Sequence, residues 1–310
     1  MAKSMRRTLL LAKIQTVEGT DAAPTALLNA ILIRNLTATP ISAEYVERAL
    51  IRPYMGNSGQ IATTQYAQVE CEVELAGSGL AGTAPAWGAL LRACGFSETI
   101  VASTSVTYAP VSSAFERLSL HYYLDGLFHQ IIDAVGTVTL DITSKAIPFL
   151  RFRFMGAYKP IIDQAMPSGV SYTRFVKPQA VNKANTPTWS LGGYQGCLQS
   201  ASVDVANQLV WRSLISCEGA QITNRNPTGA LSLELPSIAA LNWPRMVLDS
   251  ENVALAIQHG KTAGNIVELL TPTAQLTNPT YSEADDVAML GLQMNLTPNA
   301  GNDEIKIVVR

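Results

Sequence analysis

The sequence predicts a mainly β protein, a β-sandwich or barrel with short flanking helices that is duplicated within one chain. Most segments with a clear pattern alternate apolar and polar residues with the period of two that is typical of strands. The dipeptide Asp125-Gly126 separates two alternating runs in RLSLHYYLDGLFHQIID (117–133), which is a strong hairpin signal. Only two segments have a helical pattern, so strands dominate the prediction.

The predicted elements follow one another along the whole chain. The segment VECEVELAG (69–77) alternates acidic and apolar residues, and it precedes the first predicted helix, APAWGALLRAC (84–94). The second predicted helix is SIAALNWPRMVLD (237–249). Further predicted strands lie in the segments 136–154, where two strands flank residues 143–145, and 229–237, 252–260, 265–272, 287–298 and 304–310.

A Pro- and Asn-rich stretch, 177–194, predicts a linker or long loop between two β domains, 1–185 and 186–310. In each part an alternating strand leads to a helix that carries a tryptophan, Trp87 or Trp243, and then to a series of strands. This shared order indicates a duplication. Because sequence identity between the parts is low, two unrelated β segments with a chance resemblance remain the alternative.

Composition indicates a protein whose surface meets other protein. Of its 310 residues 47% are hydrophobic and only 15% are charged, against about 25% charged in ordinary soluble domains. The net charge is −2 and no basic stripe is present, which disfavours a nucleic-acid-binding domain. We expect no membrane partner, because no apolar run reaches the roughly 18 residues of a membrane span. The N-terminal apolar run is broken by Lys13, which disfavours a signal peptide.

The segment GSGLAG places Gly77, Gly79 and Gly82 in a G-x-G-x-x-G pattern that is typical of dinucleotide-binding sites. The strand before it carries glutamates on one face, whereas the first strand of such a site is apolar on both faces. Pro85 and its neighbours separate the third glycine from the helix, and Glu98, the acidic residue at the right distance, follows no second strand. We therefore interpret the glycines and Pro85 as a strand-to-helix corner.

No other constellation predicts catalysis, so we expect a protein that is not an enzyme and has no cofactor and no metal. His121 and His129 lie on opposite arms of the predicted hairpin, but further metal ligands are missing nearby. None of the four cysteines forms a C-x-x-C pair, and we expect reduced, buried thiols.

Five segments, in their order along the chain, carry a resemblance to a known family. They are VEGTDAAPTALLNAILIRN (17–35), VECEVELAGSGLAGTAPAWGALLRACGFSETI (69–100), SVTYAPVS (105–112), YYLDGLFHQIIDAVGTVTLDIT (122–143) and FLRFRFMGAY (149–158). Together they resemble the major tail tube proteins of tailed bacteriophages, especially those with long non-contractile tails. The resemblance covers most of the first 160 residues and is weaker over 186–310.

The resemblance implies a structural virion protein, made in the bacterial cytoplasm and located in the phage tail. In that family, sheets of neighbouring subunits join into a closed barrel, and the resulting rings stack into a tube through which DNA passes during ejection. Closing a barrel across subunits removes exposed strand edges, and a head-to-tail interface closes into a ring by symmetry. The implied partners are further copies of the chain, other tail proteins such as the tape measure, terminator and distal tail protein, and DNA only as passing cargo.

Two finer expectations follow from combining the resemblance with the sequence. If both halves carry the tube fold, three chains supply six domains, which predicts a trimeric ring of pseudo-six-fold appearance; a true hexamer is the alternative. Carboxylates that repel DNA would suit the lumen, and Glu70, Glu72, Glu74 and Glu234 are the candidates, with an outer solvated face as the alternative.

Two segments are expected to contact neighbouring subunits. The long stretch 37–61 carries Glu44, Glu47, Arg48 and Arg52, and in the family such a loop bridges one ring to the next. Residues 1–28 lack clear periodicity and are expected to form an arm on a neighbour. The other functions considered are a tail terminator or capsid-decorating ring protein and, more remotely, an NAD-dependent oxidoreductase.

Overall fold

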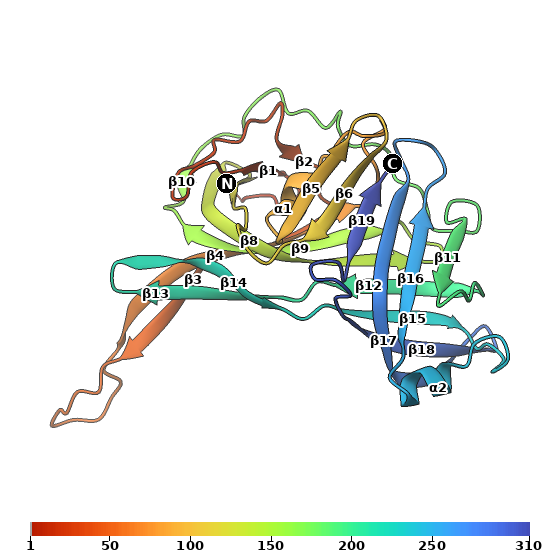
Figure 1. Cartoon of the computed structure of the whole chain (residues 1–310). Helices are drawn as coiled ribbons and strands as arrows, with labels where there is room; N and C mark the ends of the chain where they lie inside the picture. Colours follow the sequence, from red (N-terminus) through yellow and green to blue (C-terminus); the bar gives the residue numbers. More distant parts are fainter. Residues whose placement is uncertain (1) are drawn as a thin grey trace.

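The computed structural model describes residues 2–310 and consists mainly of antiparallel strands with two short helices, α1 (Gly88–Arg92) and α2 (Trp243–Leu248) (Figure 1). The strands up to residue 163 are β1 (Thr8–Ile14), β2 (Ala30–Ile31), β3 (Asn35–Glu47), β4 (Gln60–Glu74), β5 (Phe96–Val101), β6 (Ser105–Pro110), β7 (Leu118–Leu124), β8 (Leu127–Thr143), β9 (Phe149–Tyr158) and β10 (Ile162–Asp163). The later strands are β11 (Thr188–Leu191), β12 (Leu198–Asp204), β13 (Asn207–Leu214), β14 (Cys217–Arg225), β15 (Thr228–Glu234), β16 (Asn252–His259), β17 (Val267–Ala284), β18 (Val287–Leu296) and β19 (Lys306–Val309).

The first part of the chain is organised around the long strand β8. Its beginning pairs with β7, which continues through β1 to β2, and its end pairs with β9, which continues through β4 to β3. The register with β9 shifts between Ile132 and Val135, and Asp133 between them has a left-handed φ of 54°. This bulge bends β8, so that its beginning lies beside β7 and its end lies beside β9.

The second part is organised around β17 in the same way. Its beginning pairs with β16, which continues to β11, and its end pairs with β18, which continues through β15 to β12. Its register with β18 shifts between Thr277 and Thr280, and Asn278 has a left-handed φ of 47°. The orders β3–β4–β9–β8 and β12–β15–β18–β17 thus match strand for strand, while the boundary near residue 185 stays a prediction.

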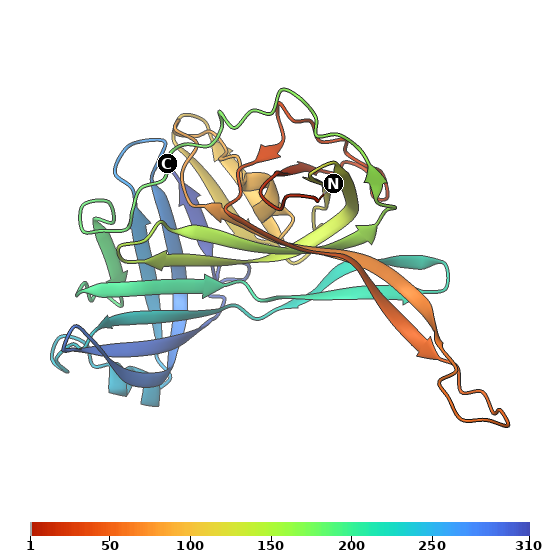
Figure 2. The same ribbon diagram turned by 180° about the vertical axis from the view of Figure 1, so that it is seen from behind.

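The two parts form one body rather than separate lobes (Figure 2). Strand β12 pairs with the end of β8, so that Thr139 lies opposite Asp204. Strand β19 lies between β6 and β17 and ties the parts together a second time. A single cluster of buried residues includes Trp87 and Phe152 of the first part and Leu255 and Leu292 of the second.

The hairpin predicted at Asp125-Gly126 is confirmed, since β7 and β8 pair across this turn. Both helices are shorter than predicted. Residues 86–87 and 238–240 form turns, and α2 begins only where Asn242 accepts a hydrogen bond from the backbone N–H of Arg245 at 3.3 Å. The predicted linker 177–194 was wrong at its end, because Thr188–Leu191 forms β11 on the edge of β16.

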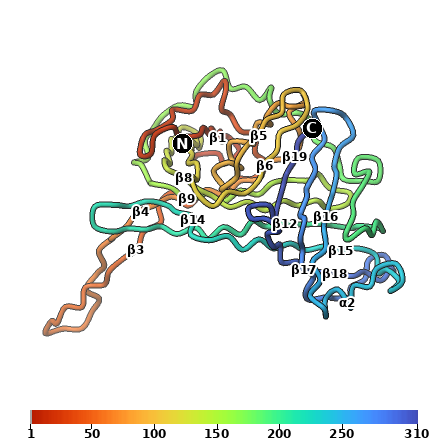
Figure 3. The backbone as a smooth tube through the Cα atoms, in the orientation of Figure 1, coloured from red at the N-terminus to blue at the C-terminus, as the bar shows by residue number. Residues whose placement is uncertain are grey.

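The expected N-terminal arm is also corrected in part. Thr8–Ile14 forms β1, which pairs with β7 along its whole length, so this segment belongs to the body of the chain. A different segment projects instead: β3 and β4 extend beyond the body and are joined by residues 48–59 (Figure 3). We call residues 40–66 the arm.

Candidate functional site

Eight strands form one continuous sheet across both parts, in the order β3–β4–β9–β8–β12–β15–β18–β17. We call it the eight-strand sheet. One face packs on the core, where Val69, Phe152, Val203 and Leu231 are at most 3% exposed. The alternate residues point away from the core, as the period of two requires. Most of these are small and uncharged, among them Thr37, Thr139, Ser202, Ser232 and Gln293.

Acidic side chains outnumber basic ones on this outward face, which we call the polar face. The acidic residues are Glu70, Glu72, Glu74, Asp141, Asp204 and Glu234, and the basic ones are Arg34, Arg151 and Arg153. The face therefore has a mostly small-residue surface on which carboxylates outnumber guanidinium groups, and this balance disfavours tight binding of phosphate.

The three glutamates of β4 differ in their surroundings. Glu72 is only 6% exposed. Its carboxylate accepts hydrogen bonds from Arg151 Nη2 at 2.7 Å and Asn35 Nδ2 at 2.6 Å, and it pairs with Arg34 Nε at 3.1 Å. Burial by itself would raise the pKa of Glu72, but these hydrogen bonds and the two guanidinium groups lower it below its usual value. Glu70 lies 3.8 Å from Arg151 Nε and keeps about half of its side chain exposed.

Carboxylates recur at matched positions of the two parts. Positions are matched by counting along the hydrogen-bond register from the left-handed residues Asp133 and Asn278. By this count Glu70 matches Glu234. Asp141 and Asp286 match as well, each eight residues beyond its left-handed residue.

The comparison with known families decides the identity. A family model described as phage tail tube protein matches residues 5–297. The chain belongs to the phage tail tube family. No curated protein matches the chain.

The family places this tail tube protein in the virion tail as a structural component, which implies a non-enzymatic role alongside other tail proteins. Among the described residues no helix has the length and apolar character that crossing a membrane requires.

The arm of this tail tube protein carries all four residues expected in an inter-ring loop. Glu44 and Glu47 lie on β3, and Arg48 and Arg52 lie in the connection beyond it. Large apolar side chains are exposed along the arm: Ile41, Tyr45, Val46, Leu50, Ile51, Tyr54, Met55 and Ile61. A contiguous exposed apolar segment of this kind marks a surface that meets another protein.

The glycines of GSGLAG lie between β4 and α1, where the chain meets the β16–β17 connection. Gly77 N–H donates to Asn265 Oδ1 at 2.7 Å, and Gly79 N–H donates to Gly264 O at 2.8 Å. A Cβ atom on Gly77 would lie 2.0 Å from Gly264 O, and Gly82 has a left-handed φ of 71°. The amides that would hold a phosphate in a nucleotide site are thus bonded to the protein itself, and Pro85 follows in the turn that leads to α1.

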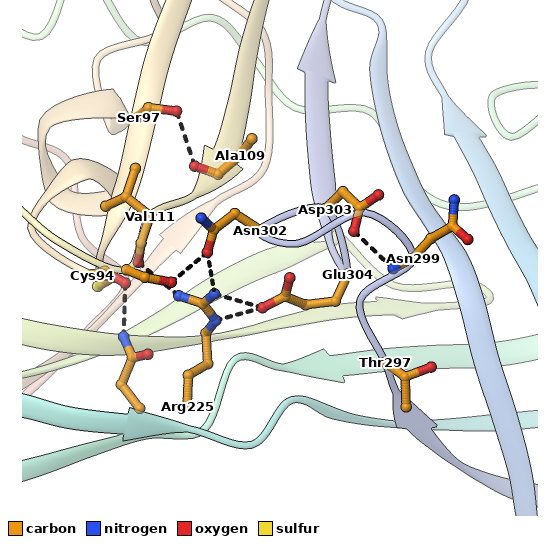
Figure 4. A network of polar contacts seen from close by, with 12 residues as sticks. Cys94, Ser97, Ala109, Val111, Arg225, Thr297, Asn299, Asn302, Asp303 and Glu304 are labelled. Atoms are coloured by element: carbon orange, nitrogen blue, oxygen red, sulfur yellow. Dashed lines mark hydrogen bonds and ion pairs between the residues drawn. The ribbon is translucent and has the colours of Figure 1, made fainter.

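A buried polar network holds the second part against the first (Figure 4). The guanidinium group of Arg225, at the end of β14, bonds Glu304 at 2.6 Å, Val111 O at 2.9 Å and Asn302 Oδ1 at 3.3 Å. Nearby, Asn207 Nδ2 donates to the carbonyl oxygen of Cys94 at 2.7 Å. Sequence reasoning missed this network, since its members are far apart in the chain and no local pattern joins them.

The β13–β14 hairpin, also missed from the sequence, packs on the polar face near the start of the arm. Ala220 is buried against Val135 and Met155. Trp211 stacks on Tyr66 with 5.5 Å between ring centroids. This hairpin connects β12 to β15 just as the arm connects β3 to β4, so the two are matched connections with different surroundings.

The remaining titratable groups are histidine and cysteine side chains at separate places in the fold. His121 contacts Asp21 at 3.0 Å. Cys71 and Cys94 are buried free thiols, but Cys197 and Cys217 are exposed, so the expectation of buried thiols is wrong for these two. Within residues 2–310 no group of three or more His, Cys, Asp or Glu side chains is arranged to hold a metal ion.

Proposed function

We propose that this protein assembles into rings that stack to form the tail tube, the conduit for DNA during ejection. Each ring contains three chains and has a pseudo-six-fold appearance. The observation that carries the proposal is the repeated pairing order, β3–β4–β9–β8 and β12–β15–β18–β17, joined edge to edge within one chain. The two domains, 1–185 and 186–310, are then copies of one tube fold, and three chains supply the six domains of a ring.

Electron microscopy of purified assemblies tests the ring. Rings with three-fold symmetry, in which a chain fills one third of the circumference, support the proposal. True six-fold rings with one chain per sixth would contradict the duplication. Single rings that never stack would favour the alternative of a tail terminator or capsid-decorating protein.

The polar face lines the lumen in this proposal, with Glu70, Glu72, Glu74 and Glu234 toward the DNA. An acidic wall lets the duplex slide, because carboxylates repel phosphate and release no counterions on contact. Glu72 contributes little free charge, since Arg151 and Arg34 neutralise it. Glu70, Glu74 and Glu234 therefore supply most of the repulsion.

Charge reversal tests the lumen. The triple variant Glu70→Lys, Glu74→Lys and Glu234→Lys should still form tubes but should slow or stop DNA ejection, with a block that weakens at high salt. The matched control reverses three exposed carboxylates elsewhere, Glu18→Lys, Asp249→Lys and Glu251→Lys. Normal ejection by the triple variant would remove the lumen assignment.

Glu44 lies where the arm leaves the sheet, and beyond it the arm bridges successive rings, with Glu47, Arg48 and Arg52 as its polar contacts and the exposed apolar residues near its tip as its buried contacts. Tubes of this type belong to long non-contractile tails, and they meet the tape measure protein inside and the terminator and distal tail proteins at their ends. A variant without residues 49–58 should form single rings that do not stack, and stacked tubes from it would contradict the bridging role.

A further inference from the structure

Two strand edges of the eight-strand sheet have no partner within the described chain. Strand β3 pairs only with β4, and residues 277–284 of β17 pair only with β18. These are the two ends of the sheet, so one lies at each side of the molecule. An open edge carries unpaired N–H and C=O groups that accept another strand.

The joint between β8 and β12 shows how such edges meet in this protein. Thr139 lies opposite Asp204 in an antiparallel register. Beyond the ladder, Val205 N–H donates to Val138 O at 3.0 Å, and Asn207 N–H donates to Thr137 Oγ1 at 3.0 Å. The end of β8 in the first part is thus bonded to β12 in the second part.

The two open edges are the matched counterparts of this joint. Strand β17 matches β8, and the register count places Ala284 at the position of Thr139. Strand β3 matches β12 through their shared pairing with β4 and β15, and Glu44 falls at the position of Asp204. Ser282 matches Thr137, so the hydroxyl that accepts the extra hydrogen bond is present at both places.

Side chains of β12 at the internal joint are more buried than those of β3 at the open edge, as expected if β3 lacks a neighbouring strand. Val203 and Val205 at the internal joint are each 2% exposed. The counterpart of Val203 on β3 is Ala43, which is only half-buried, and Tyr45, just beyond it where the β3–β4 register shifts, is 59% exposed. The edge strand therefore leaves a large apolar side chain in water, next to a position that the internal joint buries.

We propose that the end of β17 of one chain pairs antiparallel with β3 of a second copy, with Ala284 opposite Glu44. This pairing rests on the proposed ring, and it specifies the surface through which the chains of a ring meet. The joint between chains is shorter than the joint within a chain, because β17 turns at Asp285 and Asp286 where β8 continues to Thr143. Two kinds of joint then alternate around the ring.

Paired cysteines test this register in a background with Cys197→Ser and Cys217→Ser. Oxidised tubes of Glu44→Cys with Ala284→Cys should give covalent species of two and three chains and none larger. Thr139→Cys with Asp204→Cys reports the internal joint and should cross-link within one chain. Glu44→Cys with Glu283→Cys is the register control, because a shift of one residue turns the side chain to the other face.

The outcomes separate the pairing from the ring itself. Tubes in which the internal pair cross-links but the chain-to-chain pair does not would overturn the pairing and leave the tube function intact. Chains that never assemble would overturn the tube function and the pairing with it. Hydrogen exchange on the unmodified protein gives a second readout: peptides covering 43–47 and 280–284 should both gain protection on assembly, and unchanged exchange in either would overturn the proposal.

Discussion

Gly77→Ala should destabilise the free chain by about 3–5 kcal/mol. Its new Cβ would lie 2.0 Å from Gly264 O and 2.8 Å from the Cα of Asn265, so one backbone segment must move by about an ångström. Overpacking of this kind costs about 1–3 kcal/mol. The movement also breaks the hydrogen bonds of Gly77 and Gly79 to the β16–β17 connection, each worth about 1 kcal/mol.

Urea unfolding of the unassembled chain, followed by circular dichroism, measures the change. The matched control is Gly219→Ala, whose Cβ has no neighbour within 4 Å and whose φ is not left-handed. This control should change stability by less than about 0.5 kcal/mol. If Gly77→Ala is as stable as the control, the glycines are not a packed corner and the reasoning from close backbone approach is refuted.

The other predictions concern the polar clusters and the thiols. Arg225→Met should lower the free energy of unfolding in urea by about 3–5 kcal/mol, because it leaves the buried Glu304 carboxylate without its partner. The double variant Arg225→Met with Glu304→Leu should regain part of this free energy, and a double variant as unstable as Arg225→Met alone would contradict the pairing. Glu72→Gln should cost only about 1–2 kcal/mol at neutral pH, since Arg151 is half exposed. Because the folded-state pKa of Glu72 is lowered, its contribution is present above its ordinary pKa and is lost as pH falls through the lowered value, so stability curves of wild type and variant should converge in acid. Iodoacetamide should label the two exposed cysteines and spare Cys71, whose pKa burial raises to about 12, and mass spectrometry showing labelled Cys71 in the native chain would contradict this.

Alternating patterns in the sequence were sufficient to predict the mainly β class and the β7–β8 hairpin. They failed at β1, TLLLAKI, which was expected to belong to an arm. This strand is apolar on both faces: Leu9 and Leu11 pack in one cluster and Leu10 and Ala12 in another. A strand buried on both faces has no period of two, so a search for alternation misses it.

The polar face shows the complementary limit. Alternation in VECEVE indicated that three glutamates share one face, and the structure places them so. It could not indicate that Arg151, on the neighbouring strand, takes up the charge of Glu72, because the two residues are 79 positions apart. Strand pairing decides which of the three carboxylates is neutralised by a nearby arginine. Pairing between strands that are distant in the chain cannot be seen in a single local sequence pattern.

The proposed ring also accounts for the different surroundings of two matched connections. The β13–β14 hairpin packs on β8 and β9 of its own chain, where Trp211 stacks on Tyr66. The arm is the matched connection of the first part, but no strands of its own chain lie beside it in the way that β8 and β9 lie beside the hairpin. The strands equivalent to β8 and β9 are β17 and β18, and in the proposed ring they come from a neighbouring chain. Pairing of β17 with β3 of the next chain brings that surface beneath the start of the arm. Exposure of Tyr45 and Val46 in the single chain, and burial of Val203 and Val205 at the internal joint, then have one cause: each tube domain is completed only by the domain next to it.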